Sequence, residues 1–447
     1  MRVTTILDGL HLDLRTCAVL LALAACACTT SSGIEPPTES GTEAAADGST
    51  GTSGGNETTS GPDGTTEGDT EPETDTGPDA NALYHVFTRI QTPAGRTMYA
   101  SMVPSLADGE VDLAQSLELS GFSRGRVFSE RLYAFDGESA QITRYAVADD
   151  GTLAVDALDD GSPAQFSLAG LGVTFFYDTI VFIDETRAFY FDFEVDLVVE
   201  WNPSDMTITE SYEGGMKRDG FDTSSGSISV LDDTIVVPLS WGSGATGTGL
   251  LVNAVGLLDI SAPGALQIIE DDRCAGTTDT FVHDGSVYAL GDNFGGLGPA
   301  VSTDPLPAPC LLRWTPGATA FDPDYALDLS ARVGFDIVAG VRTLGDGTVL
   351  LQAYTSDEDP MELGLFPFLD GPNWERVLIS LEGDETTMLD AGGPGALGQR
   401  GWAIDGAYVF PRVDSDAGTA TLYRVEDGEA VEQLTVTGEV FHLDRVR

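Results

Sequence analysis

The chain is poor in positive charge. It has 21 Lys and Arg residues against 72 Asp and Glu residues, a formal net charge of −51 at pH 7, and Lys217 is its single lysine. A surface of this kind repels phosphate backbones and anionic lipid head groups, so we expect no nucleic-acid partner. The simplest role of the acidity is solubility.

The N-terminal region lacks an apolar run long enough to span a bilayer. Its run Ala18–Ala25 is too short for a transmembrane helix. Arg2 and Arg15 precede the run, and Leu23-Ala-Ala-Cys26 ends it, which is the order of a bacterial lipoprotein signal. We predict a signal peptide over residues 1–25 and a lipid on Cys26, with an ordinary secretory signal as the alternative.

The residues around this signal bear on localisation and on the start of translation. Ala27 follows the cysteine, which by similarity to known lipoproteins favours the outer membrane, with the protein facing the periplasm or exposed at the surface. Two or three acyl chains, at about 0.8 kcal/mol per buried CH₂, would make the membrane anchor stable. Asp8 and Asp13 are atypical so early in a signal. The true translation start is therefore left open.

Large apolar side chains are almost missing from residues 29–80. This segment consists mainly of Gly, Ser, Thr, Pro, Asp and Glu, and it has 12 acidic residues and no basic one. Nothing in it can offset the entropy cost of ordering. We predict that residues 26–80 form a lipidated, disordered tether with an r.m.s. reach of roughly 40 Å.

Cysteine is scarce beyond the tether, where only Cys274 and Cys310 occur, 36 positions apart. In an oxidising compartment they could form a disulfide, which the loop-entropy model values at roughly 4 kcal/mol. Two free thiols are the alternative.

No convincing long amphipathic helix follows residue 83, and short β-branched and aromatic runs bounded by Gly, Asp and Pro take its place. A recurrent Asp-Gly-x-x-Tyr-like strand provides seven anchor residues, separated by 47 to 62 positions. The anchors are Tyr84, Tyr133, Tyr190, Val237, Tyr288, Leu350 and Tyr408. This period predicts an all-β fold over residues 81–447, a seven-bladed β-propeller of four-stranded antiparallel blades.

The first repeat lacks an inner strand, whereas the C-terminus has a spare one, Gly438–Arg445. We predict that this strand pairs beside residues 83–90 and closes the ring, which would hide both sheet edges. A ragged tail is the alternative. Closure would put His85 and His442 on adjacent strands, where we interpret them as packing residues and not as metal ligands.

Catalytic signatures are missing as well. The sequence has no histidine cluster, no Cys-x-x-Cys and no P-loop. The acidic clusters Asp357–Asp359 and Asp414–Asp416 could supply oxygen ligands to Ca²⁺, but neither matches a complete calcium loop. We interpret them as solvated turns and assign no cofactor, no metal ligand and no catalytic residue.

Loop length distinguishes three neighbouring repeats. In the fourth, fifth and sixth repeats the connection after the anchor strand expands to residues 240–249, 291–309 and 355–373. Equivalent connections emerge on one face, so we predict that these loops form a binding wall over the central channel. The alternative is that the loops only pack against the propeller and bind nothing. The candidate binding residues of the wall are Trp241, Asn293, Phe294, Phe366, Phe368 and Trp374.

Two stretches carry a family resemblance. They are Leu266-Gln-Ile-Ile-Glu-Asp-Asp-Arg273 and Leu311-Leu-Arg-Trp314, the latter followed by Phe321-Asp-Pro-Asp-Tyr325. Over about 100 residues the chain resembles the MxcI-type family of exported propeller lipoproteins that accompany siderophore genes. The resemblance implies a role near siderophore or iron uptake and supplies no catalytic residues.

Two classes of function follow. The first is a membrane-anchored, non-enzymatic binding or scaffold lipoprotein, monomeric, whose partner is an outer-membrane receptor or another protein. The second is a propeller enzyme of lactonase or quinoprotein type with a metal- or cofactor-lined channel, for which Ca²⁺ would be the natural metal.

Overall fold

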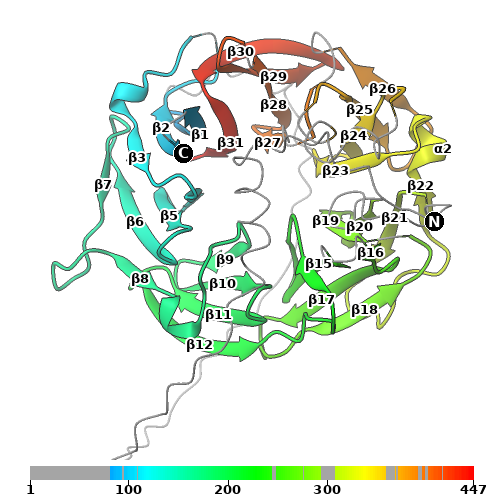
Figure 1. Ribbon diagram of the computed structural model, residues 1–447, viewed down its shortest axis with the longest axis horizontal. Coiled ribbons are helices and arrows are strands. Elements are labelled where there is room, and N and C mark those ends of the chain that lie inside the picture. Colours follow the sequence, from blue (N-terminus) through cyan, green and yellow to red (C-terminus); the bar gives the residue numbers. More distant parts are fainter. Residues whose placement is uncertain are drawn as a thin grey trace, which may run out of the picture. The chain divides into compact units, whose positions relative to one another are not determined.

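The computed structural model describes residues 81–447 except 93–94, 108, 244–247, 275, 293–307, 359–367, 369–370, 391–394, 398–400 and 415. The described residues form seven antiparallel sheets arranged as a ring of blades (Figure 1). The predicted seven-bladed propeller is therefore confirmed. No helix in this part of the chain is long and apolar enough to cross a membrane.

Each blade is named here by its place along the chain, with strands given from the centre of the ring outward. Blade 1 contains β31 (Glu439–Arg445), β1 (Tyr84–Thr92), β2 (Gly95–Val103) and β3 (Leu117–Leu119). Blade 2 contains β4 (Arg124–Phe128), β5 (Arg131–Asp136), β6 (Gln141–Val147) and β7 (Leu153–Val155), with β8 (Gln165–Ser167) also paired to β6. Blade 3 contains β9 (Ile180–Asp184), β10 (Arg187–Asp192), β11 (Leu197–Asn202) and β12 (Thr207–Glu213).

Blade 4 is the most elaborate of the seven. It contains β13 (Asp222–Ser224), β14 (Ser229–Leu231), β15 (Thr234–Ser243), β16 (Thr248–Gly249), β17 (Asn253–Asp259) and β18 (Gln267–Asp271). Blade 5 contains β19 (Thr277–His283), β20 (Ser286–Gly291), β21 (Cys310–Trp314) and β22 (Ala326–Asp328).

The last two blades are regular. Blade 6 contains β23 (Val338–Thr343), β24 (Thr348–Tyr354), β25 (Trp374–Ser380) and β26 (Thr386–Leu389). Blade 7 contains β27 (Trp402–Ile404), β28 (Ala407–Asp414), β29 (Thr419–Glu426) and β30 (Glu429–Thr437). The short helical segments are η2 (Leu113–Gln115), η3 (Ala169–Leu171) and α2 (Leu329–Val333).

The anchor residues all lie in the second strand of their blade, because β31 takes the innermost place in blade 1. These second strands are buried almost without interruption, as in β20 and β24. A strand sandwiched between neighbouring blades is covered on both faces, so it favours a continuous apolar run over alternation. Hydrophobic clusters accordingly join adjacent blades, such as the one that combines residues of blades 3 and 4.

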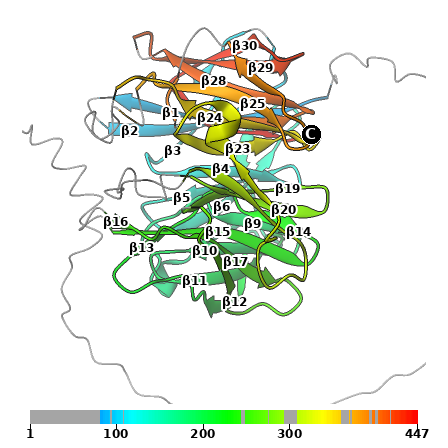
Figure 2. The ribbon, with the colours of Figure 1, turned by 90° about the vertical axis from the view of Figure 1, so that its right-hand side faces the viewer.

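The C-terminal strand closes the ring as predicted. β31 pairs antiparallel with β1, with Val86 opposite Leu443 and Phe87 opposite His442. The pairing continues past the strand, where the amide of Val446 donates to the carbonyl of Leu83 at 2.7 Å. Figure 2 shows β1 and β2 beside β28 and β29, so the first and last blades are neighbours. Both ends of the described chain are thus fastened into one sheet.

Truncation after Thr437 tests this closure. Loss of β31 exposes the edge of β1 and removes the inner wall of blade 1, so we expect the single cooperative thermal transition to broaden or split. Differential scanning calorimetry of the parent and the truncated protein measures the effect. A truncated protein that melts like the parent would contradict the closure model.

Candidate functional site: the axial channel

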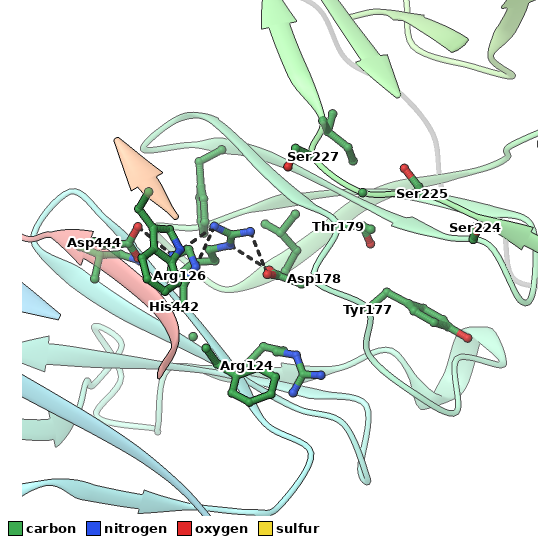
Figure 3. Close-up of a pocket in the computed structure, with 18 of the residues that line it drawn as sticks. Arg124, Arg126, Tyr177, Asp178, Thr179, Ser224, Ser225, Ser227, His442 and Asp444 are labelled. Atoms are coloured by element: carbon green, nitrogen blue, oxygen red, sulfur yellow. Dashed lines mark hydrogen bonds and ion pairs between the residues drawn. The ribbon is translucent and has the colours of Figure 1, made fainter. Parts of the chain in front are cut away.

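The centre of the ring contains a cavity of about 740 Å³, which we call the axial channel. Innermost strands of six blades line it: β31, β4, β9, β13, β23 and β27. Innermost strands meet at the axis of a propeller, so residues far apart in the sequence come together there. Figure 3 shows this arrangement of side chains.

One side of the channel carries a network of five charged or titratable residues. The Arg126 guanidinium forms a two-pronged ion pair with Asp178, with Nε–Oδ1 at 2.8 Å and Nη2–Oδ2 at 2.9 Å. His442 Nε2 lies 2.8 Å from Asp444 Oδ1, and His85 Nδ1 lies 3.7 Å from Asp444 Oδ2. The backbone amide of Val127 also donates to Asp444 Oδ2 at 3.0 Å. We call the five side chains Arg126, Asp178, His442, Asp444 and His85 the channel network.

The orientation of His442 follows from its neighbours. The Asp444 carboxylate only accepts hydrogen bonds, so the facing Nε2 of His442 carries a proton. Nη1 of Arg126 lies 3.1 Å from Nε2 and 3.3 Å from Nδ1 of the same ring. The His442 ring is therefore held between Arg126 and Asp444.

Burial sets the proton affinities of the network. Burial lowers the pKa of His85, because its fully buried ring has no water to stabilise a positive charge. Burial alone would raise the pKa of Asp444, but interactions with His442 and His85 hold it well below its usual range. Burial alone would raise the pKa of Asp178 too, but Arg126, His442 and Arg124 together lower it.

Arg124 lies at the open end of the network. Figure 3 shows its side chain reaching from β4 into the channel on the side of Tyr177. It donates to the carbonyl of Ser123 at 3.0 Å and forms no ion pair with any described carboxylate. Burial, and then the nearby charges of Arg89 and Arg96, lower its pKa, against an opposing effect of Asp178. In a protein with so few cations, this is an unusual place for an uncompensated one.

The opposite side of the channel is lined by the small residues 223 to 227, at the end of β13 and in its connection to β14. Ser227 is tied down because its amide donates to Asp279 Oδ1 at 3.0 Å, and Arg342 Nη1 lies 3.3 Å from the same oxygen. Ser225 is different: its hydroxyl is shielded from solvent and has no hydrogen-bond partner. A buried hydroxyl without a partner is costly, so Ser225 is a less well satisfied part of this wall than Ser227.

The candidate wall residues need a correction where the structure describes them. Trp241, Phe368 and Trp374 are buried, with exposed fractions of 1%, 0% and 0%. The indole of Trp241 donates to the carbonyl of Met216 at 2.7 Å, and that of Trp374 donates to the carbonyl of Phe368 at 2.9 Å. These rings fold back into the core and present no binding face to solvent. Asn293, Phe294, Phe366 and Cys26, the predicted lipidation residue, lie outside the described residues.

The disulfide prediction is confirmed. Cys274 and Cys310 are bonded, with a Cα–Cα distance of 5.9 Å, and both are buried. Cys310 begins β21 and Cys274 lies just ahead of β19, so the bond fastens two strands of blade 5 on either side of β20. It stabilises the scaffold and does not line the channel.

The stretches that carry the family resemblance also have a structural explanation. Arg273 pairs with Asp271 and donates to the carbonyls of Asp322 and Tyr325 at 2.8 and 3.0 Å. Arg313 pairs with Asp322 and lies over the ring of Tyr325. The two stretches therefore contact each other and fasten blade 4 to blade 5, away from the channel.

Metal-ligand chemistry was the other alternative. Within the part of the chain that the structure describes, no three His, Cys, Asp or Glu side chains are grouped to hold a metal ion. The carboxylate of Asp414 accepts hydrogen bonds from the amides of Asp416 and Ala417 at 3.0 Å each, as in a turn.

The channel residues were missed as a site in the sequence. Only the placement of His442 on a strand beside that of His85 was predicted, and it is correct. A usable signal was present in Arg124 and Arg126, two arginines spaced by two in the innermost strand of blade 2 in a strongly acidic chain. Asp178 and Asp444 carry no local pattern of their own.

No protein-family model and no curated protein matches the chain. Solved structures do match. A proposed 6-phosphogluconolactonase from Bacteroides fragilis is 8% identical with a TM-score of 0.52, over 84% of this chain and 100% of that one. One from Bacteroides uniformis is 9% identical with a TM-score of 0.47, over 82% and 99%. A variant of the Synechocystis apocarotenoid oxygenase is 11% identical with a TM-score of 0.45, over 82% and 93%. At such identities the likeness shows the propeller fold alone.

The channel network predicts an acid-sensitive fold. Because the folded state lowers the pKa of His85, the unfolded chain takes up that proton first. Stability is then complete above about pH 6.5 and falls below it by up to about 1.4 kcal/mol per pH unit. The lowered pKa of Asp444 adds a further loss below about pH 4. His85→Gln should remove the first loss, as measured by denaturant unfolding between pH 7 and 5.

The control is His283→Gln, because His283 lies on β19 and outside the network. An unchanged pH slope in His85→Gln would show that another group senses the acid.

Proposed function

We propose that this protein is a membrane-anchored, non-enzymatic binding lipoprotein that holds a small anionic ligand in its axial channel and serves iron-chelate uptake. The observation that carries the proposal is the uncompensated Arg124 at the open part of a 740 Å³ channel. Sites for small molecules are concave and contain a few well-placed polar groups, and the channel has both properties.

The chemistry of the channel supports binding more than acid–base catalysis. A general base needs a free lone pair directed at the reacting group. Asp178 is paired with Arg126, and Asp444 already accepts hydrogen bonds from His442 and Val127. The ring nitrogens of His85 have no hydrogen-bond partner among the described residues, but this ring is fully buried and does not line the channel. The two carboxylates are thus held by their neighbours, which suits a rigid wall.

Iron chelates enter the proposal through the resemblance to the MxcI-type lipoproteins. Ferric complexes with catecholate donors are anionic and rich in oxygen, and a guanidinium favours such groups. The lipid anchor on Cys26 and the tether would keep the propeller near an outer-membrane receptor, which is the partner that we propose.

Isothermal titration calorimetry of the purified full-length protein tests the ligand. We expect a ferric catecholate to bind with a Kd in the micromolar range and a neutral ferric hydroxamate to bind at least about tenfold more weakly, since only the first pairs with Arg124. Ser225→Trp fills the channel and should weaken binding at least about tenfold.

Ser261→Trp is the matched control, because Ser261 lies in an exposed turn between β17 and β18. Melting temperatures of both variants establish that the fold is intact. Equal binding by the two tryptophan variants, or no binding of any ferric chelate, would refute the proposal.

Anchoring is tested separately. Cys26→Ser removes the thiol that accepts the lipid, so we expect loss of radiolabelled palmitate and release of the protein from the outer-membrane fraction. Cys28→Ser, two residues on, controls for the loss of a cysteine. Labelling that persists in Cys26→Ser would contradict the assignment of the lipidated residue.

A further inference from the structure

The mouth of the axial channel on blades 1 to 3 is edged by aromatic rings. Phe122 and Phe175 have ring centroids 6.0 Å apart, Phe175 and Tyr177 5.4 Å, and Tyr177 and Phe193 6.4 Å. Phe441 adds a fifth ring on β31. We call these five residues the aromatic rim. Tyr177, Phe193 and Phe441 also line the channel.

The rim lies on the face of the propeller from which the long loops of blades 4 to 6 also emerge. Consecutive strands of a blade run up and down. The connection from second to third strand and the connection to the next blade therefore lie at the same end. Phe122 precedes β4, and Phe175 and Tyr177 precede β9. The rim is thus part of the face on which the sequence predicted a binding wall, but on the opposite half of the ring.

Arginines accompany these rings. The Arg96 guanidinium lies 5.0 Å from the ring centroid of Phe122, and that of Arg124 lies 5.4 Å from the ring centroid of Phe441. Arg89 also lies over Phe441, but it is paired with Glu439. Among the described residues, Arg96 and Arg124 form no ion pair, and of these two only Arg124 lines the channel.

We infer that the channel mouth binds an aromatic carboxylate, with the carboxylate on Arg124 and the aromatic ring packed along Tyr177 and Phe441. The inference rests on the proposed function, because it takes the channel to be a ligand site. A guanidinium fork matches a carboxylate with two parallel hydrogen bonds. Aromatic rings prefer offset or edge-on contact with another ring, which the tilted rings of the rim can supply.

The charge of the channel selects a monoanion. Arg126 is paired with Asp178 and Arg342 with Asp279, so Arg124 is the channel guanidinium that balances one negative charge of a ligand. The Asp444 carboxylate opposes a second negative charge. A phosphate dianion would therefore carry one charge more than Arg124 balances. An aromatic cation would meet Arg124 directly.

Calorimetric titration of the full-length protein with benzoate, acetate, benzyl alcohol and inorganic phosphate tests the inference. We expect benzoate to bind at least about tenfold more tightly than the other three, because only benzoate has both the ring and the single charge. Arg124→Gln should weaken benzoate binding about 10- to 100-fold, the loss typical of a charge-assisted hydrogen bond. Arg124→Lys should fall between the parent and Arg124→Gln, because it keeps the charge and loses the fork.

Arg332→Gln is the matched control, since Arg332 of α2 pairs with Asp384 and does not line the channel. Equal binding of benzoate and phosphate, or parental benzoate affinity in Arg124→Gln, would overturn the inference. A ferric chelate that binds while benzoate does not would leave the proposed function standing and refute the inference. If benzoate binds through Arg124 while no ferric chelate binds, the inference stands and the proposed role in iron-chelate uptake is refuted.

Discussion

The pairing of β31 with β1 is the contact on which the rest of the structure depends. A propeller is a ring of blades, and without a closing strand its first blade would be left with an open inner edge. Here the last strand of the chain fills that place and joins the two ends of the described chain in one sheet. The same strand brings His442 and Asp444 into the channel, where they meet Arg126 of blade 2. The same strand therefore closes the ring and completes the channel wall, because His442 and Asp444 reach the channel only when β31 pairs with β1.

The scarcity of cations makes their distribution informative. Several arginines hold neighbouring blades together by donating to backbone carbonyls. Arg144 of blade 2 reaches the carbonyls of Pro203 and Ser204, Arg273 those of Asp322 and Tyr325, and Arg376 of blade 6 that of Pro411. Buried carbonyls need donors, and a guanidinium supplies several at once, so these arginines have a clear structural use. Arg124 has no comparable use, since it donates only to the adjacent carbonyl of Ser123. That contrast within one protein is what singles it out.

The sequence predicted the architecture well and the site poorly, for different physical reasons. The repeat was visible because a strand buried on both faces needs a continuous apolar run, and tight turns bound each run at regular spacing. The spare strand at the C-terminus likewise implied closure. The aromatic residues assigned to the long loops misled, because Trp241 lies at the end of β15, where its ring is buried and its indole donates to the carbonyl of Met216. The partners of Arg126 could not be read from spacing. Asp178 lies 52 positions away and His442 lies 316 away, and only the closed ring makes them neighbours.

The acidity of the protein and an anion site in its channel are compatible because they act over different distances. Surface carboxylates are screened beyond about 8 Å at physiological ionic strength, so they affect how fast an anion approaches more than how tightly it is held. Inside the channel, a direct contact with Arg124 outweighs distant charge. The same reasoning explains why Asp178 and Asp444 matter more than the whole acidic surface: they lie in the channel itself. They are also neutralised in part, Asp178 by Arg126 and Asp444 by hydrogen bonds from His442 and Val127. The network therefore keeps Asp178 and Asp444 engaged with other residues, which leaves the Arg124 guanidinium available to a ligand.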